Sequence, residues 1–323
     1  MQHELPTVTV IIPTRPGAGK PLALDAAKAL DYPKEKVEIL VTRGRQPAVQ
    51  RNHALRAARG DLVYFLDDDA LPQPANLKRS LEYFKQPATQ MVGGPNICPP
   101  EAPLLERVFA VCLASALAFG PSRARYTSVG QPRATTEKEL ILCNLMARRE
   151  EVLKLGGFDE SLYPNEENAL MDALQQHGGK LMYDPEFIAL RRPRPTLKAF
   201  LRMLFNYGRG RAEQFRLHPT PGSILNFVPP LFCLYLAALL ALAISAPAWL
   251  PWAALPLGLY GLALLGQTVV SAKSMGSGRS LLAIPFLVAT HVFYGFGFWR
   301  GLFTGLKPAT VENIGPVEVE RVQ

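Results

Sequence analysis

Three long apolar runs near the C-terminus constrain the fold of this chain more than any other feature. They cover roughly residues 224–246, 249–270 and 281–299, and none of them contains Lys, Arg, Asp or Glu. Each run approaches the roughly 20 residues that a helix needs to cross the hydrocarbon of a bilayer. The residues before these runs mix charged and apolar side chains normally. The sequence therefore predicts a soluble part followed by a membrane part.

The charges of the connecting segments predict how the runs are oriented. The loop between the first two runs has no basic residue, whereas the next loop contains Lys273 and Arg279. The positive-inside rule places that second loop and the N-terminal part in the cytoplasm. The chain starts with MQHELPTVTVIIP, which lacks the basic residues and the long apolar run of a signal peptide. We therefore expect an integral protein of the cytoplasmic (inner) membrane whose N-terminal domain faces the cytoplasm.

The location of the C-terminal tail depends on whether the third run crosses the membrane. Three crossings from a cytoplasmic start would leave the tail outside, with the acidic residues Glu312, Glu318 and Glu320. The alternative is that Arg300 and Lys307, which follow the third run closely, hold its end inside.

The net charge of +8 is concentrated directly before the first apolar run. From Arg191 to Arg216 the chain has eight basic residues and one acidic residue, Glu213. Residues 197–205 also place leucine and phenylalanine at helical spacing between basic residues, which predicts an amphipathic helix lying flat on the membrane. Membrane lipids are therefore the expected partners of this basic region, and nucleic acid is not. The apolar segment 104–119 is short for a span and predicts a membrane-surface or buried helix.

Three short runs in the N-terminal part are typical of buried strands. They are residues 8–12 (VTVII), 37–41 (VEILV) and 62–66 (LVYFL), and each is followed by turn residues and a helix-like segment. Strands that alternate with helices predict an α/β fold with a mostly parallel central sheet. Ligands of such sheets bind beyond the carboxyl ends of the strands. The chemistry should therefore lie just after these three runs.

Three consecutive carboxylates, Asp67, Asp68 and Asp69, follow the third run. Like charges packed at a strand end raise each other's pKa and cost free energy unless a cation is present. Mg²⁺ or Mn²⁺ prefers oxygen ligands and often completes its shell with substrate phosphates. One alternative is a solvated turn before the next helix. Another is a phosphatase of the haloacid-dehalogenase type, whose Asp-x-Asp-x-Thr/Val motif is broken here by Leu71.

An ordered set of motifs resembles the family-2 inverting glycosyltransferases of the GT-A fold. The donor half of that family is matched by IIPTRP at residues 11–16, by QRN at 50–52, and by GD at 60–61 before FLDDD. Its acceptor half is matched by NLMAR at 144–148, GGFDE at 156–160 and NEEN at 165–168. The resemblance covers about residues 5–190, and the C-terminal arrangement is similar to membrane enzymes of exopolysaccharide assembly.

The resemblance implies four regions along the chain. Residues 1–195 would form a cytoplasmic GT-A catalytic domain, and residues 196–222 an amphipathic interfacial helix and linker. Residues 223–306 would form a transmembrane region of about three helices, and residues 307–323 a polar tail.

The resemblance also implies roles for individual residues. Asp67 and Asp69 would be the Asp-x-Asp pair that meets Mn²⁺ or Mg²⁺, and Asn144 would contact the acceptor. The residues expected to bind the nucleotide-diphosphate donor are Pro13, Thr14, Arg15, Thr42, Arg51, Asp61, Asp67 and Asp68.

An acidic pair that opens a helix supplies the general base in that family. Glu166 and Glu167 stand at this place, and Glu167 aligns with the usual aspartate, so it is the expected base. The structural alternative is that two glutamates in a first helical turn only interact favourably with the helix dipole.

Two departures from the family pattern limit the prediction. The second run is followed by Thr42 and Arg43 instead of an acidic residue that would contact the nucleotide base, so uracil recognition is left open. The Gln-x-x-Arg-Trp motif of processive polymerases is replaced by NYGRGR at residues 206–211, so a long processive polymer is not expected.

The resulting hypothesis is an inverting, metal-dependent transfer of a sugar from a nucleotide-diphosphate donor to a polyprenyl-linked saccharide acceptor. Arg209 and Arg211 would bind the acceptor's diphosphate, because paired guanidiniums fork onto phosphate oxygens. Alternatively, these arginines only satisfy the positive-inside rule. Two other functions stay open: a polyprenyl-phosphate glycosyltransferase of the dolichol-phosphate-mannose type, and a catalytically silent membrane scaffold.

Overall fold

The computed structural model describes residues 4–162, 165–217, 219, 221–305 and 315–323. The chain forms two compact units. The first consists of Met1–Pro99, Pro121–Arg192 and Lys307–Gln323, and the second of Pro100–Gly120 and Pro193–Leu306. This division differs from the expected one in two places. Segment 100–120 belongs with the apolar helices, and the C-terminal residues belong with the first unit.

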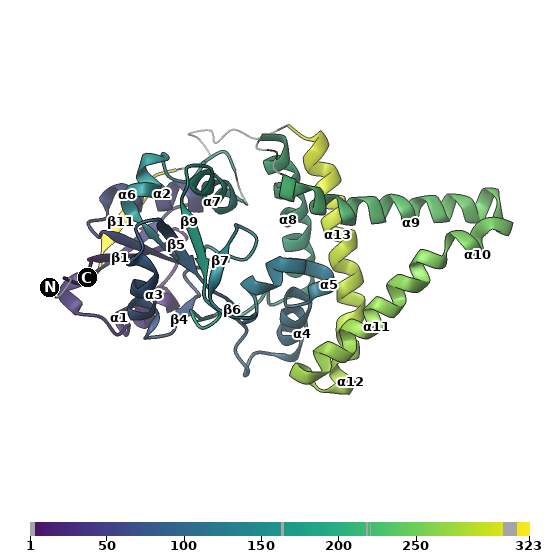
Figure 1. Ribbon diagram of the computed structural model, residues 1–323, viewed down its shortest axis with the longest axis horizontal. Coiled ribbons are helices and arrows are strands. Elements are labelled where there is room, and N and C mark those ends of the chain that lie inside the picture. The colour runs from purple at the N-terminus through teal and green to yellow at the C-terminus, as the bar shows by residue number, and fades with distance from the viewer. Residues whose placement is uncertain (1–3, 163–164, 218, 220, 306–314) are drawn as a thin grey trace. The chain divides into compact units, whose positions relative to one another are not determined.

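The first unit alternates strands and helices, as the sequence predicts (Figure 1). Its strands are β1 (Val8–Thr14), β2 (Val37–Arg43), β3 (Leu62–Leu66), β4 (Leu71–Pro72), β5 (Thr89–Gly93), β6 (Asn96–Ile97), β7 (Arg133–Thr135), β8 (Asn144–Arg148), β9 (Lys180–Tyr183), β10 (Ala189–Leu190) and β11 (Glu318–Arg321). Its helices are α1 (Leu22–Lys28), η1 (Lys34–Lys36), α2 (Pro47–Ala57), α3 (Asn76–Phe84), η2 (Gly120–Arg125), α6 (Arg149–Lys154) and α7 (Glu166–Gln176).

Eight strands form the central sheet in the order β11-β2-β1-β3-β8-β5-β9-β7. The three predicted strands are confirmed as β1, β2 and β3, and β1 pairs in parallel with both of the others. The pairings make β1, β2, β3, β5 and β9 run one way, while β7, β8 and β11 run the other way. The sheet is therefore mixed, with five strands in one direction and three in the other, and the carboxyl ends of β1, β2 and β3 meet at one edge.

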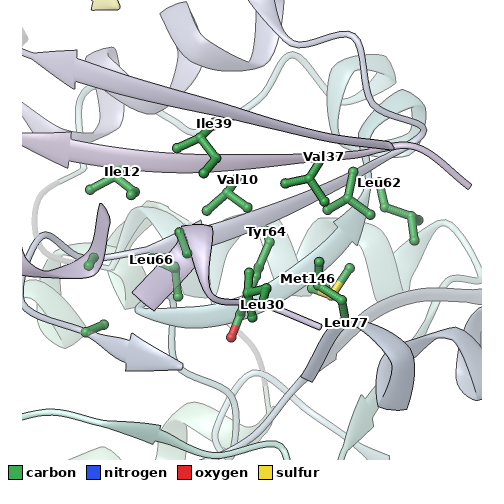
Figure 2. Close-up of a cluster of buried hydrophobic side chains, with 14 of the residues drawn as sticks. Val10, Ile12, Leu30, Val37, Ile39, Leu62, Tyr64, Leu66, Leu77 and Met146 are labelled. Atoms are coloured by element: carbon green, nitrogen blue, oxygen red, sulfur yellow. The ribbon is translucent and has the colours of Figure 1, made fainter. Parts of the chain in front are cut away.

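Alternating side chains bury both faces of this sheet. Val10 and Tyr64 point into a core that includes residues of α1 and α3 (Figure 2). Their neighbours Ile11 and Phe65 point into a second core with residues of α2, α6 and α7. Since successive strand residues face opposite sides, a strand covered on both faces reads as a continuous apolar run. This explains why LVYFL is an uninterrupted apolar run.

A small sheet with the order β4-β10-β6 lies next to the end of β3. Strand β10 pairs antiparallel with β4, and Leu190 lies opposite Leu71. This pairing carries the residue after β10, Arg191, back to the aspartates that separate β3 from β4.

The C-terminal residues add the edge strand β11 to the central sheet. It pairs antiparallel with β2, with Glu318 opposite Arg43 and Arg321 opposite Leu40. The Nε atom of Arg321 also lies 2.6 Å from Oε1 of Glu38 on β2. Residues 318–321 are therefore part of the first unit. The sequence predicted a separate polar tail at residues 307–323, and these four residues depart from that prediction.

The second unit is helical. Its elements are α4 (Leu104–Leu113), α5 (Ala116–Phe119), α8 (Leu197–Leu217), η3 (Pro221–Phe227), α9 (Val228–Ser245), η4 (Pro247–Trp249), α10 (Leu250–Ala253), α11 (Leu255–Met275), α12 (Ser277–Ser280), η5 (Leu281–Ala283) and α13 (Ile284–Phe303). By length and composition, three helical stretches of the described residues could cross a membrane: Gly222–Ser245, Pro247–Lys273 and Leu281–Phe303. They correspond to the three apolar runs of the sequence.

Helices α8 and α13 lie side by side and run in the same direction (Figure 1). Helix α8 continues through Gly208 and Gly210, where the sequence predicts only a short amphipathic helix and a linker. The reason is close backbone packing. A Cβ atom on Gly208 would overlap the Tyr294 carbonyl oxygen, and one on Gly297 would overlap the Phe205 carbonyl oxygen. Glycine is therefore required where the two helices touch.

We predict that Gly297→Leu lowers the melting temperature of the detergent-solubilised protein, because overpacking typically costs about 1–3 kcal/mol. Gly258 on α11 is the matched control, since a Cβ atom there would meet nothing within 4 Å. Differential scanning fluorimetry on both variants is the measurement. Equal melting temperatures would contradict the close α8–α13 contact.

Candidate functional site

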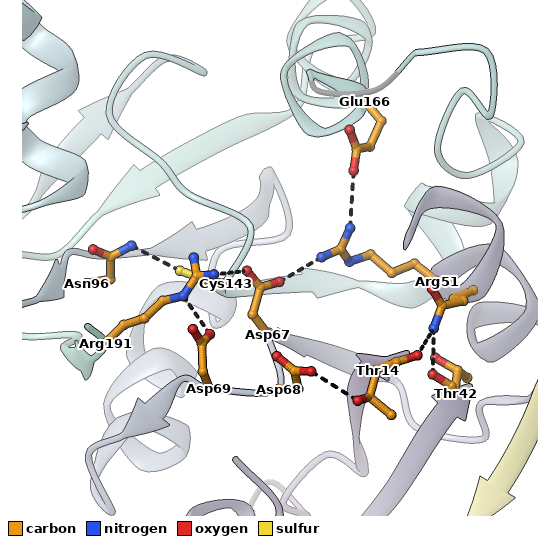
Figure 3. Close-up of polar contacts among 11 residues, drawn as sticks. Thr14, Thr42, Arg51, Asp67, Asp68, Asp69, Asn96, Cys143, Glu166 and Arg191 are labelled. Atoms are coloured by element: carbon orange, nitrogen blue, oxygen red, sulfur yellow. Dashed lines mark hydrogen bonds and ion pairs between the residues drawn. The ribbon is translucent and has the colours of Figure 1, made fainter. Parts of the chain in front are cut away.

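The three carboxylates predicted to carry the chemistry follow the carboxyl end of β3 (Figure 3). The Asp68 carboxylate accepts a hydrogen bond of 3.0 Å from the Thr14 hydroxyl at the end of β1. Asp67 and Asp69 face a different group. The three aspartates therefore have different partners: Asp68 binds the neighbouring strand, whereas Asp67 and Asp69 are directed toward one shared cation.

That cation is the guanidinium of Arg191, which sequence reasoning missed as a site residue. Its Nη2 atom lies 3.0 Å from Oδ2 of Asp67, and its Nε atom lies 2.6 Å from Oδ1 of Asp69 (Figure 3). In the sequence, Arg191 is simply the first residue of the basic run before the membrane part. The only signal in the sequence was indirect, because adjacent carboxylates at a buried strand end require a positive charge.

The guanidinium also tests whether Asp67 and Asp69 fit a metal ion. Two carboxylates from this turn converge on one positive group, so it stands in for a cation at that point. Within the described residues, no group of three or more His, Cys, Asp or Glu side chains is arranged to hold a metal. A divalent ion held by Asp67 and Asp69 would therefore need further oxygens, and Mg²⁺ and Mn²⁺ often take these from substrate phosphates. The donor set fits such an ion.

Arg51 on α2 connects the aspartates to a second carboxylate. Its Nη2 atom lies 2.8 Å from Oδ1 of Asp67, and its Nη1 atom lies 3.2 Å from Oε1 of Glu166. The Arg51 side chain is only 6% exposed, so water screens these ion pairs weakly. Arg51 therefore fixes the end of β3 to the start of α7 (Figure 3).

The two residues beside Arg51 position the rest of the site. Gln50 donates from Nε2 to the carbonyl oxygens of Thr14 (2.7 Å) and Thr42 (2.6 Å), which ties the ends of β1 and β2 together. Asn52 donates to the Phe158 carbonyl at 2.8 Å and accepts from the Phe158 amide at 2.8 Å. The QRN motif thus holds two strand ends, two carboxylates and the GGFDE turn from one turn of helix.

Glu166 and Glu167 begin α7 as expected, but their surroundings differ. Glu166 is buried, and its Oε2 atom has no hydrogen-bond partner among the residues that the structure describes. The pKa of Glu166 is raised to about 8. Burial is the largest cause, the neighbouring Glu167 also raises the pKa, and Arg51 lowers it. Glu167 is only partly buried.

The residue before this pair, Asn165, has a φ of 101°, and it is the one non-glycine residue in the described chain with a positive φ. Asparagine tolerates this conformation better than most residues, and such outliers gather at functional sites. The backbone therefore turns sharply to deliver the two glutamates.

Two predicted site residues do not join this group. Asp61 precedes β3, and its carboxylate accepts hydrogen bonds of 2.8 Å from the Thr7 amide and hydroxyl. At ~3.3 Å per strand residue, this end of β3 is roughly 20 Å from Asp67. Asn144 is fully buried, accepts from Tyr64 and donates to the carbonyls of Pro95 and Phe187. Both residues have structural contacts here instead of facing the aspartates.

The other predicted residues divide between the two units. Pro13, Thr14 and Thr42 lie buried at the carboxyl ends of β1 and β2, and the exposed Arg15 follows β1. Arg209 and Arg211 belong to α8 in the second unit. The Nε atom of Arg209 lies 3.7 Å from Glu213, and Arg211 donates to Gln214 at 3.2 Å.

Comparisons with known proteins relate part of this chain to a family of glycosyltransferases. Residues 22–124, about a third of the chain, match the family model described as Glycosyl transferase family 2. The chain is 29% identical over 158 residues to the succinoglycan biosynthesis protein ExoA of Rhizobium meliloti, covering 49% of this chain and 46% of ExoA. It is 28% identical over 176 residues to the pre-mycofactocin glycosyltransferase of Mycobacterium tuberculosis, covering 54% of this chain and 36% of that protein. The matched region thus spans less than half of either relative.

The fold also resembles a solved structure. The mannosyltransferase PcManGT from Pyrobaculum calidifontis, in complex with GDP-Man and Mn²⁺, aligns with a TM-score of 0.55 at 18% sequence identity. The alignment covers 93% of this chain and 88% of that protein. The expected GT-A fold with apolar C-terminal helices is confirmed.

Glu166 makes the stability of this protein depend on pH. The carboxyl ionises near the ordinary glutamate pKa of 4.5 when the chain is unfolded, but only near about 8 when it is folded. Between these values the folded state binds more protons, so the free energy of unfolding falls as pH rises. Glu166→Gln removes this loss, and we predict that its stability relative to wild type rises by up to about 1.4 kcal/mol per pH unit in this window.

Thermal unfolding of both proteins in detergent across this pH range is the measurement. The exposed Glu150, on α6, provides the control variant Glu150→Gln. Stability curves of wild type and Glu166→Gln that stay parallel would contradict a neutral, buried Glu166.

Proposed function

We propose that this chain, which carries a glycosyl transferase family 2 domain on a GT-A fold, transfers a sugar with inversion from a nucleotide-diphosphate donor to a lipid-linked saccharide at a membrane surface. The observation that carries the proposal is the pair Asp67 and Asp69 sharing one cation at the carboxyl end of β3. Ligands of sheets with this topology bind beyond the carboxyl ends of the strands.

The proposed donor site lies where β1, β2 and β3 end. Thr14 and Thr42 would contact the nucleotide, with Pro13 and Arg15 beside them. Gln50 holds the two strand ends at a fixed spacing through its two carbonyl contacts. The neighbouring fold of PcManGT was solved with GDP-Man and Mn²⁺, and we propose ligands of the same class here.

Asp67 and Asp69 would hold Mn²⁺ or Mg²⁺, which would neutralise the charge that develops on the leaving diphosphate. Arg51 holds the Asp67 carboxylate in place through its 2.8 Å contact. Arg191 neutralises the same aspartates when no other cation is near them.

Glu167 is the proposed general base, and Glu166 is a positioning residue. A base must reach the acceptor hydroxyl, and the partly buried Glu167 is more accessible than the buried Glu166. Glu166 holds Arg51, and so it acts on the site through that guanidinium. Glu167 would take the proton of the acceptor hydroxyl as its oxygen attacks the anomeric carbon.

The acceptor and the membrane anchoring complete the proposal. ExoA is a succinoglycan biosynthesis protein, which supports assembly of a polysaccharide as the context. Three stretches of the second unit are long and apolar enough to cross a membrane, and we propose the cytoplasmic (inner) membrane with the catalytic unit in the cytoplasm. Arg209 and Arg211 would bind the diphosphate of a polyprenyl-linked acceptor. Their side chains also contact Glu213 and Gln214 on the same helix.

We predict that Asp69→Asn weakens Mn²⁺-dependent binding of a nucleotide-diphosphate sugar by at least about tenfold, because the amide loses the charge that holds the cation. Arg191→Met is the matched variant, since it keeps both carboxylates and removes the competing guanidinium. Its Mn²⁺-dependent binding should equal or exceed that of wild type. Isothermal titration with UDP- and GDP-sugars is the measurement, and unchanged binding in Asp69→Asn would sink the metal assignment.

We further predict that Glu167→Gln leaves donor affinity nearly intact and lowers transfer to a saccharide acceptor by about 10²-fold or more, since a base acts in the transition state. Single-turnover assays with a lipid-linked saccharide are the measurement. Full activity on a polyprenyl phosphate, which is already ionised, would instead favour the dolichol-phosphate-mannose type of reaction. Absence of both transfer and donor hydrolysis in the wild type would indicate a silent scaffold.

A further inference from the structure

We propose that only α9 and α11 cross the membrane, as a helical hairpin, and that α4, α8 and α13 form a layer that lies against the bilayer on the catalytic side. The partner of this layer is an anionic lipid surface. The inference rests on the proposed membrane anchoring, and it changes the expected topology, in which three crossings leave the C-terminal residues outside.

The position of β11 makes the number of crossings even. Residues 318–321 pair with β2 in the central sheet of the catalytic unit, and Arg321 forms an ion pair with Glu38. The backbone amide of Ile39 also donates to the carbonyl of Gln323 at 3.0 Å. A strand cannot pair across a bilayer, so the segments before α8 and after α13 lie on the same side. Three crossings between them are excluded.

The same reasoning applies to α4 and α5. The bent pair Leu104–Leu113 and Ala116–Arg125 is apolar enough to pass as one broken span, with an angle of 53° between its parts. However, the chain leaves the catalytic unit at Pro99 and re-enters it at Pro121. One crossing would separate two parts of a single sheet, because β5 and β8 on either side of this segment are paired. The pair therefore enters and leaves on the same side.

Packing within the second unit identifies α13 as the helix that does not cross. Phe109 of α4 stacks on Phe200 of α8 at 4.0 Å and meets Phe286 at the start of α13 at 5.3 Å, edge to face. Helix α13 then follows α8 through the glycine contacts at Gly297 and Gly301. Since α8 carries six charged side chains, it cannot lie in hydrocarbon without high cost, and α13 shares its depth.

Burial separates α13 from the other two candidates. In its most apolar window, 39% of residues are buried inside the protein, against 11% in the windows of both α9 and α11. A helix that faces lipid on most sides stays unburied in the protein, as α9 and α11 do. These two helices converge at α10, away from the α8–α13 pair (Figure 1).

The ends of the hairpin carry the side chains expected at two membrane surfaces. At the α10 end, Trp249 and Trp252 are exposed, and tryptophan is enriched at membrane interfaces. At the other end, Lys273 lies in the last turn of α11 and Arg279 follows on α12, as the positive-inside rule requires for the cytoplasmic side.

The proposed surface layer combines basic and apolar exposed side chains. Lys198 and Arg202 of α8 are exposed, as are Leu104 of α4 and Phe296 and Phe303 of α13. Helices with exposed apolar and basic residues bind the boundary between headgroups and acyl chains, and the basic residues favour anionic lipids. The three helices therefore fit a lipid surface better than either water or hydrocarbon alone.

Cysteine labelling of the full chain tests the topology. One variant carries Ala248→Cys at the tip of the hairpin, and a second carries a cysteine appended after Gln323. Both are expressed in cells and treated with a membrane-impermeant maleimide, and labelling is measured above that of the parent with its four native cysteines. We expect the first to be labelled in intact cells, and the second only after permeabilisation. Labelling of the appended cysteine in intact cells, or no labelling at Ala248→Cys before permeabilisation, would overturn the proposal.

Two further measurements separate the possible failures. Oxidation should join Arg43→Cys to Glu318→Cys, which lie opposite each other, and should not join Glu38→Cys to Glu318→Cys, which lie five residues out of register. If the double variant Arg43→Cys, Glu318→Cys folds but does not cross-link, β11 does not pair with β2, and the argument for an even number of crossings fails. Alkaline carbonate extraction tests the anchoring itself. Release of the protein into the supernatant would refute the membrane part of the proposed function, whereas retention with an external C-terminus would refute only the hairpin.

Discussion

The site depends on one buried guanidinium that bridges two carboxylates from distant parts of the chain. Arg51 binds Asp67 at the end of β3 and Glu166 at the start of α7, which are 99 residues apart in sequence. Removing one partner of a buried ion pair such as that of Arg51 with Asp67 typically costs about 3–5 kcal/mol, because the other charge is left without compensation. The same helix turn uses Gln50 and Asn52 to hold the strand ends and the GGFDE turn. Without Arg51, the acidic cluster and the glutamate pair would lose their fixed spacing, and the reaction geometry would be lost with it.

This arrangement resolves the electrostatic conflict that the sequence poses. Three carboxylates in a row repel one another. Two arginines offset this repulsion, Arg51 from α2 and Arg191 from the end of β10. The two guanidiniums differ in exposure. Arg51 is almost inaccessible and so is suited to a permanent structural role, whereas Arg191 contacts the more exposed Asp69. An acidic site built in this way is preorganised for a ligand that brings its own cation, because the carboxylates are already aimed before it arrives.

The sequence predicted local features well and long-range pairings poorly. Apolar β-branched runs are dictated by burial on both faces of the sheet, so β1, β2 and β3 were predictable, and the carboxylates at the end of β3 followed directly. Asp61 was expected at the donor site because a motif records order along the chain, and it does not record at which end of a strand a residue lies. Arg191 was missed because its position depends on the β4–β10 pairing, whose two-residue strands leave almost no periodic signal. The continuation of α8 through Gly208 and Gly210 was also hidden, since glycine disfavours an isolated helix by about 1 kcal/mol and here is required by contact with α13.

The C-terminal strand shows why charge rules alone do not decide the topology of this chain. The positive-inside rule weighs basic residues in short loops, and it distinguishes the loop with Trp249 from the loop with Lys273. It does not take into account a strand that returns to a folded domain after the last apolar helix. Backbone pairing supplies this information, because four consecutive residues of β11 are in register with β2. A helix as apolar as α13 is then kept at the surface by the packing of Phe109 and by its glycine contacts with α8. Hydropathy measures whether a helix can enter hydrocarbon, whereas the connection of its two ends determines whether it can cross.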